Sequence, residues 1–248
     1  MDVYWLEQSE ADVPGDNQWL CASEAACLAA MRIPKRRADW SLGRWTAKRA
    51  LAIYLNAPTD AQALANIELR PAASGSPEAF IVGRPADASV SLSHRNGLAL
   101  CALAAPGMAL GCDLELIEPR SDAFVADYFT NEEQALLAQA SAADLPLLST
   151  LLWSAKESAL KALHEGLRLD TRSVKVSLLE AIAASRSDQQ TPAKTPFLPQ
   201  HGLIWHPVEV HSATAEVFRG WWQQSGNLLR TVVGAPPPNS PMALKNPT

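Results

Sequence analysis

The sequence predicts an α+β protein built from two comparable halves. Helical segments followed by short apolar runs occur in each half, and the two sets meet near Gly107–Gly111. Asn96-Gly97 and Pro106-Gly107 separate successive apolar runs, which is typical of tight turns between antiparallel strands. A chain of 248 residues is long enough for two joined units. We expect an N-terminal half over 1–108, a C-terminal half over 109–234 and a Pro-rich, disordered tail over 235–248.

Two helices are expected early in the chain. Asp16–Ile33 has an amphipathic pattern, and a second helix covers about Asp39–Leu55. Arg44 and Lys48 are four residues apart on the second helix and therefore share a face. Gly43 lowers the stability of that helix by about 1 kcal/mol relative to alanine. A glycine there lets backbone or ligand come close, or it is a packing choice.

Strands follow in the middle of the chain. Ser89–Leu92, Leu98–Ala104 and Met108–Ile117 are short apolar runs, and we expect them to form a three-stranded antiparallel meander.

The second half repeats the order of helices and then strands. Thr130 to Glu133 fits a capping box that opens a helix through about Ala142, and a longer helix covers about Leu145–Glu165. The stretch Ser185–Gly202, rich in Pro, Gln, Thr and Ser, is expected to be a loop. Further strands are expected over Val174–Leu178, Leu203–Val210, Ala215–Arg219 and Leu228–Val233.

Charge is distributed unevenly along the chain. The net charge of −5 argues against a nucleic-acid partner. Seven of the 21 basic residues nevertheless lie between Arg32 and Arg49, which favours a small anionic ligand; a solvated helix face is the alternative. No uninterrupted apolar stretch approaches the roughly 20 residues that span a bilayer, and the N-terminus lacks a basic signal region. We expect a cytoplasmic protein with no membrane partner.

A pair of carboxylates marks the segment Gly111-Cys112-Asp113-Leu114-Glu115. In a strand, Asp113 and Glu115 point to one face, while Cys112 and Leu114 point to the other. Adjacent carboxylates repel each other unless a cation compensates them, and Mg²⁺ prefers such oxygen ligands. An edge strand with an acidic solvent face is the alternative.

A second group of polar residues lies on the helix around Trp153-Ser154-Ala155-Lys156-Glu157. Trp153, Glu157 and Lys161 are successive i, i+4 neighbours and form one stripe. Because a tryptophan is rarely left fully exposed, the stripe is expected to line a cleft. Glu157 could then be a third metal ligand, and Lys161 could neutralise a phosphate. The alternative is an ordinary surface ion pair.

A serine and a histidine end one strand at a tight turn. Ser93 and His94 are suitable donors to a phosphate, although a turn histidine with no ligand role is the alternative. The segment has no GxSxG elbow and no adjacent acid, so a serine-hydrolase triad is unsupported.

Together these segments resemble the ordered motifs of surfactin-type 4′-phosphopantetheinyl transferases. The resemblance rests on Ser-Leu-Ser-His, Gly-Cys-Asp-Leu-Glu and Trp-Ser-Ala-Lys-Glu-Ser-Ala-Leu-Lys, in that order and at that spacing, and covers roughly residues 30 to 180. Leu42-Gly43-Arg44 resembles the family's N-terminal phosphate-binding region. Gly75-Ser76-Pro77 resembles its Gly-Lys-Pro turn, but Ser76 stands where lysine is usual, and Arg95 is a candidate to compensate.

The resemblance implies two similar α/β halves related by a pseudo-twofold axis, with coenzyme A bound between them. Asp113, Glu115 and Glu157 match the family's ligands for Mg²⁺, with Mn²⁺ as an alternative ion. Lys161 matches the lysine that contacts the transferring phosphates. The residues expected to contact coenzyme A are Arg36, Arg44, Lys48, Gly75, Ser93, His94 and Lys161.

The implied activity is transfer of the 4′-phosphopantetheine arm of coenzyme A to a serine of an apo acyl- or peptidyl-carrier protein, with release of 3′,5′-ADP. This is the reaction of a holo-[acyl-carrier-protein] synthase, expected here from a monomer. Carriers of fatty-acid, polyketide and nonribosomal peptide synthesis all remain open as partners. Asp113, Glu157 and Lys161 are the expected catalytic residues. Our hypothesis is that Glu157, or a water molecule on the metal, accepts the proton of the serine.

Several alternatives stay open. Lys35, Arg36 and Arg37 could serve the 3′-phosphate of coenzyme A or an acidic helix of the carrier protein. A non-catalytic module that binds coenzyme A or a carrier, or a Mg²⁺-dependent phosphohydrolase, would also use acidic and basic residues. The sequence lacks the GxxxxGK[ST] loop that would favour a nucleotide phosphohydrolase.

Overall fold

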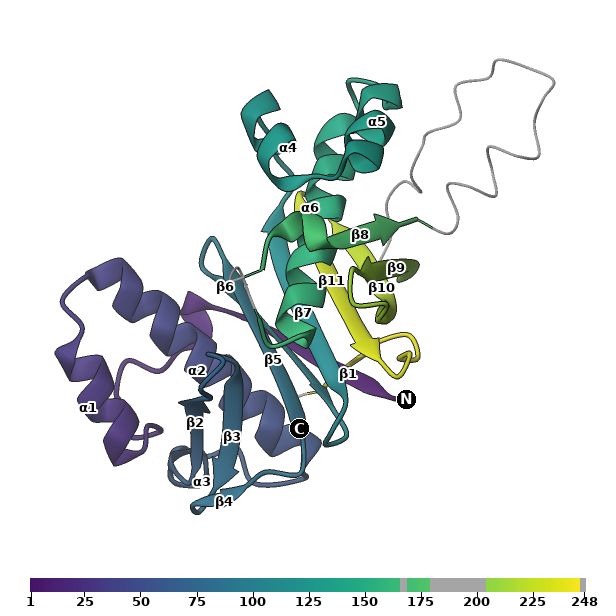
Figure 1. Cartoon of the computed structure of the whole chain (residues 1–248). Helices are drawn as coiled ribbons and strands as arrows, with labels where there is room; N and C mark the ends of the chain where they lie inside the picture. Colours follow the sequence, from purple (N-terminus) through teal and green to yellow (C-terminus); the bar gives the residue numbers. More distant parts are fainter. Residues whose placement is uncertain (166–168, 179–203, 246–248) are drawn as a thin grey trace.

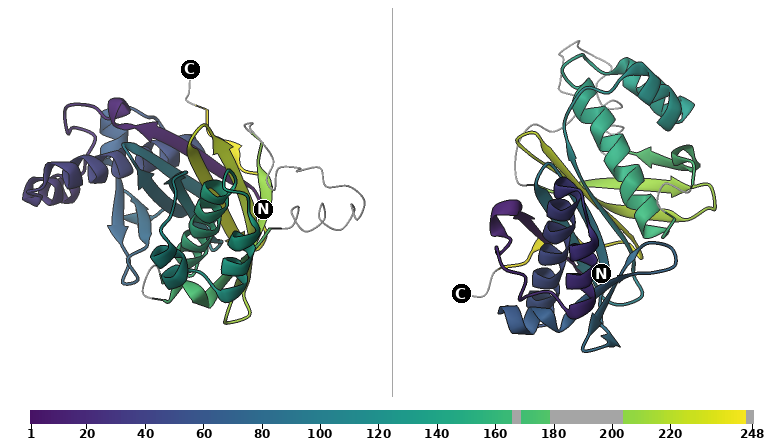
Figure 2. Two further views of the ribbon diagram at one scale, coloured as in Figure 1. Left: turned by 90° about the horizontal axis from the view of Figure 1, so that it is seen from above. Right: turned by 90° about the vertical axis from the view of Figure 1, so that its left-hand side faces the viewer.

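The computed structural model describes residues 1–165, 169–178 and 204–245 of the chain (Figure 1). Strands in these ranges form three sheets, and helices α2 (Pro34–Tyr54) and α6 (Leu145–Ala162) each pack on a different sheet (Figures 1 and 2). The expected α+β class is confirmed. The expected loop Ser185–Gly202 lies outside the described residues.

The N-terminal half starts with a strand that the sequence pattern did not predict, β1. Its sheet has the strand order β12-β1-β6-β5, and a smaller sheet contains β2, β3 and β4. The elements in chain order are β1 (Val3–Ser9), α1 (Ala22–Ala30), α2 (Pro34–Tyr54), α3 (Ala61–Ala65), β2 (Ile67–Pro71), β3 (Pro77–Ile81), β4 (Arg84–Pro85), β5 (Ser89–Arg95) and β6 (Leu98–Ala104).

The first two helices divide the chain differently from the prediction. Helix α1 is shorter than expected, because Cys21 is its extended N-cap residue and Met31 is extended just after its end. Helix α2 begins at Pro34, about five residues before the expected start. Proline is tolerated there because the amide hydrogens of a helix's first turn have no partner within the helix.

The described residues of the C-terminal half form a five-stranded sheet with the order β7-β11-β10-β9-β8, three α-helices and a short 3-10 helix at Thr171–Ser173. The elements in chain order are β7 (Ala109–Leu116), α4 (Asp122–Tyr128), α5 (Asn131–Gln139), α6 (Leu145–Ala162), β8 (Val174–Ser177), β9 (His206–Ser212), β10 (Val217–Ser225) and β11 (Leu228–Ala235). The capping box between Thr130 and Glu133 is present at the start of α5, as predicted.

The meander prediction is wrong for its third strand. Strands β5 and β6 form the expected antiparallel hairpin, but β7 pairs antiparallel with β11 instead of β6. The second edge of β6 is occupied by β1, which pairs with it from Val3 to Ser9. The chain therefore leaves the first sheet after β6 and starts a second one with β7.

The expected disordered tail is ordered as far as residue 245. Strand β12 (Met242–Ala243) pairs in parallel with β1, and the backbone amide of Leu244 donates to the carbonyl of Trp5. The indole of Trp221 also donates to the carbonyl of Pro238 at 3.1 Å. These backbone partners hold a segment whose own sequence has no apolar periodicity, which is why sequence reasoning predicted disorder there.

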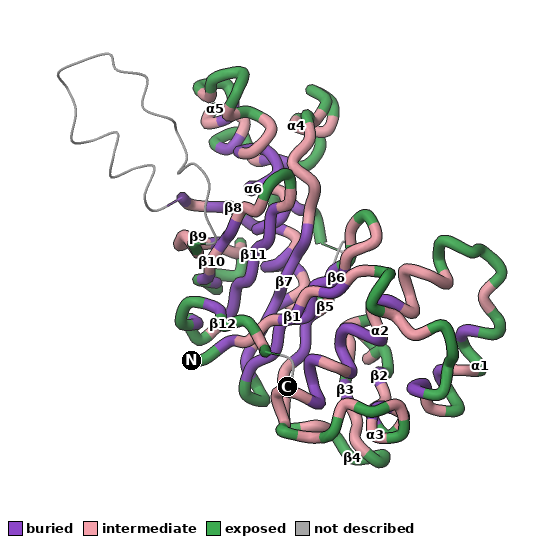
Figure 3. Tube along the Cα trace, turned by 180° about the vertical axis from the view of Figure 1, so that it is seen from behind, coloured by how far each residue is buried: buried purple, intermediate pink, exposed green. Residues whose placement is uncertain are grey.

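The two larger sheets share one order of strands. In the first, β1 pairs with β6 and β6 with β5; in the second, β7 pairs with β11 and β11 with β10. Strands β6, β7 and β11 are buried along most of their length (Figure 3). Among the described residues, no helix has the length and apolar character needed to cross a membrane.

Candidate functional site

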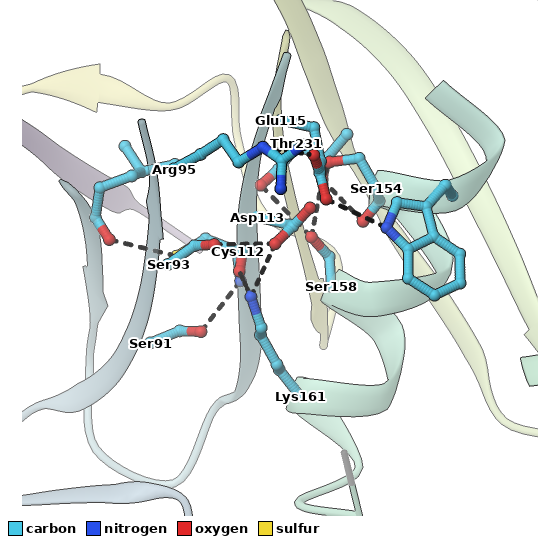
Figure 4. Close-up of polar contacts among 12 residues, drawn as sticks. Ser91, Ser93, Arg95, Cys112, Asp113, Glu115, Ser154, Ser158, Lys161 and Thr231 are labelled. Atoms are coloured by element: carbon cyan, nitrogen blue, oxygen red, sulfur yellow. Dashed lines mark hydrogen bonds and ion pairs between the residues drawn. The ribbon is translucent and has the colours of Figure 1, made fainter. Parts of the chain in front are cut away.

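Strands β5 and β7 and helix α6 meet at a group of polar side chains (Figure 4). Asp113 on β7 is buried, and its Oδ1 accepts hydrogen bonds from the Ser93 hydroxyl and the Lys161 ammonium, both at 2.8 Å. Lys161 also donates to the carbonyl of Cys112 at 3.0 Å. The predicted motifs around residues 93, 113 and 161 are thus brought together by residues from both halves.

Gly111 permits this approach. A Cβ atom at this position would lie 1.8 Å from the Ser158 carbonyl oxygen and 2.9 Å from the Ala162 nitrogen, both backbone atoms of α6. A side chain there would push α6 away from β7. The glycine of the Gly-Cys-Asp-Leu-Glu motif therefore sets the distance between the carboxylates on the strand and the residues on the helix.

Among the described residues, two buried carboxylate oxygens lack hydrogen-bond partners, one on Asp113 and one on Glu157. They are Oδ2 of Asp113 and Oε1 of Glu157. Burial, together with the neighbouring charges of Asp113 and Glu115, raises the pKa of Glu157 to about 7. Burial alone would lower the pKa of Lys161, but Asp113, Cys112 and Glu157 outweigh it and raise that pKa.

Glu115 has partners on both oxygens. The indole of Trp153 donates to its Oε1 at 3.1 Å, and a guanidinium nitrogen of Arg95 and one of Arg120 each lie 3.4 Å from its Oε2. Burial and the charge of Asp113 raise the pKa of Glu115, although the two arginines oppose this shift. Sequence reasoning did not identify Arg120, whose position five residues after Glu115 gave no periodic signal.

Asp113, Glu115 and Glu157, together called the acidic cluster, have the chemistry of a site for a hard divalent cation. Within the described residues, no three acidic, histidine or cysteine side chains are already arranged as metal ligands. The charge of Asp113 nevertheless raises the pKa of Glu115 and that of Glu157, and two buried oxygens of the three carboxylates are unpartnered. A cation such as Mg²⁺ would satisfy these oxygens and relieve the repulsion, so the residues fit this ion.

A basic pocket of about 280 Å³ adjoins the acidic cluster. Four residues expected to contact coenzyme A line it: Arg44, Gly75, Ser93 and His94. Two further lining residues, Trp40 and Arg70, were missed by sequence reasoning. The guanidinium carbon of Arg44 lies 4.9 Å from the centre of the Trp40 ring, a cation–π contact. Gly43 also lines this pocket, and a Cβ there would meet no atom within 4 Å, so a packing role is unsupported.

A neighbouring pocket of about 240 Å³ reaches Lys161 and His164. It shares the lining residues Gly75, Pro77 and Leu92 with the basic pocket, so the two pockets adjoin and are together called the groove. The hydroxyl of Ser76, the residue in place of the usual lysine, hydrogen-bonds that of Ser74 at 2.8 Å. Gly75 between them has a φ of 90°, which glycine adopts most easily.

The structure contradicts two expectations about basic residues. Lys48 is fully buried, forms an ion pair with Glu24 and donates to the carbonyl of Trp19 at 3.0 Å, so it does not face the pocket. Lys48 lies on the same helix face as Arg44 but is not exposed as that position suggested, because Glu24 on another helix pairs with it. Arg95 contacts Glu115 and Glu118. These acidic contacts do not support a role for Arg95 in place of the lysine missing at residue 76.

The three neighbouring basic residues on α2 have different surroundings. Arg36 lines a pocket with His94 and Trp40, as expected for a ligand contact. Lys35 also lines it and forms an exposed pair with Asp39 at 3.2 Å. Arg37 instead donates to the carbonyls of Leu28 and Met31 at 2.5 and 3.1 Å, at the carboxyl end of α1.

Comparisons with known proteins connect this geometry to an activity. Residues 109–214 match a family model described as the 4′-phosphopantetheinyl transferase superfamily. No curated protein matches the sequence. A solved structure with some similarity is holo-[acyl-carrier-protein] synthase from Thermotoga maritima, at 20% identity over 52% of this chain and 74% of that chain. Its TM-score of 0.31 does not establish a common fold. The segment matched by the family model contains Asp113, Glu115, Glu157 and Lys161, and it supports a phosphopantetheinyl transferase activity in general.

Proposed function

We propose that this protein transfers the 4′-phosphopantetheine arm of coenzyme A to a serine of an apo carrier protein and releases 3′,5′-ADP. One observation carries the proposal. Lys161, which pairs with Asp113 of the acidic cluster, lines one end of the groove, and Arg44 and His94 line the other end. A substrate with a pyrophosphate and a separate 3′-phosphate requires two such charged regions.

In this proposal, each end of the groove binds one charged part of coenzyme A. Arg44, Arg36 and His94 contact the 3′-phosphate, and Gly75 lets the backbone approach the nucleotide. Lys161, held 2.8 Å from Asp113, places a positive charge beside the pyrophosphate. Mg²⁺, with Mn²⁺ as an alternative, would be held by Asp113, Glu115 and Glu157, and would neutralise charge on the pyrophosphate oxygens.

The transfer forms a bond between the serine Oγ and the β-phosphorus, and breaks the bond from that phosphorus to the bridging oxygen. The electron pair of the broken bond leaves with 3′,5′-ADP, next to Lys161. The proton of the serine must move to a base. Glu157 is suited to accept it, because it lies on the helix that carries Lys161 and its buried Oε1 has no hydrogen-bond partner. This assignment requires that Glu157 retain a free oxygen in the loaded site.

We also propose the finer classification as a surfactin-type enzyme with two halves related by a pseudo-twofold axis, divided near residue 108. The shared strand order β1-β6-β5 and β7-β11-β10 supports this division. The groove is lined from both halves of one chain, by Gly75 and Lys161 for example, which supports a monomeric enzyme.

Mass spectrometry tests the proposed activity directly. The full chain is incubated with coenzyme A, Mg²⁺ and an apo acyl-carrier protein, and in parallel with an apo peptidyl-carrier domain. We expect one carrier to gain a single phosphopantetheine, and EDTA to abolish the gain. Coenzyme A consumed with the carrier unmodified would indicate a hydrolase, and coenzyme A bound but unconsumed would indicate a binding module.

A further inference from the structure

The same buried ion pair anchors the long helix of each half. Lys48 on α2 pairs with Glu24 on α1, and Lys156 on α6 pairs with Glu133 on α5. Both lysine side chains are 0% exposed, and both glutamates are nearly as buried. These side chains place four charges in the protein interior, where burying an isolated charge has a high free-energy cost.

The pair in the C-terminal half uses every donor of its lysine. The ammonium of Lys156 contacts Glu133 Oε2 at 2.7 Å and donates to the carbonyls of Thr171 and Val174 at 2.9 and 2.6 Å. Glu133 Oε1 accepts the backbone amide of Val176 at 2.9 Å. The pair therefore ties α6 to α5 and to β8, which fixes the rotation of α6 about its own axis.

The pair in the N-terminal half repeats this pattern. Glu24 occupies the third position of α1, as Glu133 does in α5, and its Oε1 accepts the amide of Leu69 on β2 at 3.1 Å. Lys48 contacts Glu24 and donates to the carbonyl of Trp19 at 3.0 Å. Glu24 Oε1 also lies 3.8 Å from Nε of Arg44.

Each anchor is close in sequence to a charged residue that its helix contributes to the site. Lys156 directly precedes Glu157, and Lys48 follows Arg44 by one turn. Replacing a whole buried pair by apolar groups is often neutral for stability, so stability alone does not account for two such pairs. A fully satisfied buried ion pair does, however, fix one orientation of the elements that carry it.

We propose that these are positioning pairs with separate tasks. Glu133–Lys156 orients Glu157 and Lys161 toward Asp113, and so controls the binding of the divalent cation. Glu24–Lys48 orients Arg44 in the basic pocket, and so controls the binding of coenzyme A. The inference rests on the proposed function for the identity of these two ligands.

Two matched double variants test the separation of tasks. Each double variant removes one ion pair without leaving an unpaired buried charge. The first is Glu133→Gln with Lys156→Met, and the second is Glu24→Gln with Lys48→Met. Mg²⁺ binding is measured by calorimetry on the full chain, and the KM for coenzyme A and kcat are measured by carrier modification. Circular dichroism and thermal unfolding report the folded fraction.

Each double variant should weaken the binding of a different ligand. We expect the variant of Glu133 and Lys156 to bind Mg²⁺ about tenfold more weakly, with the KM for coenzyme A unchanged. This factor is near the lower end of the losses seen when residues that orient metal ligands are removed. The second should raise the KM for coenzyme A by a similar factor and leave Mg²⁺ binding unchanged. Equal losses of active protein in both variants, with wild-type Mg²⁺ affinity and KM in the folded fraction, would overturn the proposal.

Two further controls keep the test decisive. If a double variant does not fold, Glu133→Asp and Glu24→Asp replace it; they keep the charge, shorten the side chain by one methylene, and must show the same split. Wild-type protein is measured first for Mg²⁺ binding and carrier modification. Failure of the wild type overturns the proposed function, whereas a functional wild type with no split between the variants overturns only the positioning roles.

Discussion

The two halves of the molecule share a scaffold and differ in the charges that they place on it. Helix α2 carries Trp45-Thr46-Ala47-Lys48 and then Arg49, whereas α6 carries Trp153-Ser154-Ala155-Lys156 and then Glu157. In the sheets, Asp113 pairs with the fourth residue of β11, and Leu6 pairs with the fourth residue of β6. Leu6 is thus the counterpart of Asp113, and by the same register Gln8 is the counterpart of Glu115.

This difference separates what holds the fold from what performs the chemistry. The anchors and the strand order occur in both halves, so they belong to the scaffold. The acidic cluster occurs only around β7 and α6, and the corresponding positions of the N-terminal half hold no carboxylate. The N-terminal half instead supplies Arg44 and His94. The N-terminal half therefore serves the 3′-phosphate of the proposed substrate, while the C-terminal half serves the cation and the pyrophosphate.

The largest effect is expected from Asp113→Asn. Loss of this charge removes a proposed metal ligand and the ion pair of Lys161, so the rate of carrier modification should fall by about 10³-fold. The control is Gln8→Leu in the other half, where the amide oxygen is buried without a hydrogen-bond partner. This variant should keep the rate within about twofold. Equal rates for Asp113→Asn and wild type would remove the distinction between the halves.

A smaller effect is expected from Gly111→Ala. The added methyl group would overlap the backbone of α6, so the free energy of unfolding should drop by about 3 kcal/mol, measured with urea. Gly43→Ala is the matched control, because a Cβ there meets nothing and alanine favours a helix by about 1 kcal/mol. It should stabilise the protein. If both variants had the same stability, close contact between β7 and α6 would not depend on glycine.

Sequence reasoning predicted the features that depend on local periodicity. Alternation along residues 111–115 correctly indicated that Asp113 and Glu115 come from one strand face, and the i, i+4 rule grouped Trp153, Glu157 and Lys161. Asn96-Gly97 correctly indicated the hairpin of β5 and β6. Each of these signals involves residues within about two turns or one hairpin of each other.

Features that depend on distant partners were missed. Lys48 looks like its neighbour Arg44 in the sequence, and only Glu24, on another helix, reveals that it is buried. Strand β7 was assigned to β6 because its real partner β11 follows more than a hundred residues later. The repeat of Trp-Thr/Ser-Ala-Lys at residues 45–48 and 153–156 was visible in the sequence. It would have indicated the shared scaffold.

The raised pKa of Glu157 predicts a dependence of stability on pH in the absence of metal ions. A carboxyl group with a raised folded pKa stabilises the protein fully below its ordinary pKa of 4.5, and this contribution is lost as the pH rises through about 7. The loss should be roughly 2–3 kcal/mol between pH 4.5 and 8. Glu157→Gln should flatten this profile in urea unfolding measured with EDTA. An unchanged slope in the variant would assign the titration to another group.

Mg²⁺ binding to the wild type should respond to the same proton. Below pH 7 the proton on Glu157 competes with the cation, so affinity should rise with pH and level off above about pH 7. Calorimetry at several pH values measures this dependence, and an affinity independent of pH between 6 and 8 would contradict it.

The smallest effect is expected from the basic pocket of the N-terminal half. Arg44→Gln removes one proposed cationic contact to the 3′-phosphate, so the KM for coenzyme A should rise about tenfold, with kcat nearly unchanged. Arg37→Gln, seven positions earlier on the same helix, is the control. Because Arg37 donates to carbonyls of α1, its loss should lower stability by about 1 kcal/mol without raising the KM for coenzyme A. A higher KM for the carrier in Arg44→Gln, with an unchanged KM for coenzyme A, would instead assign this pocket to the carrier protein.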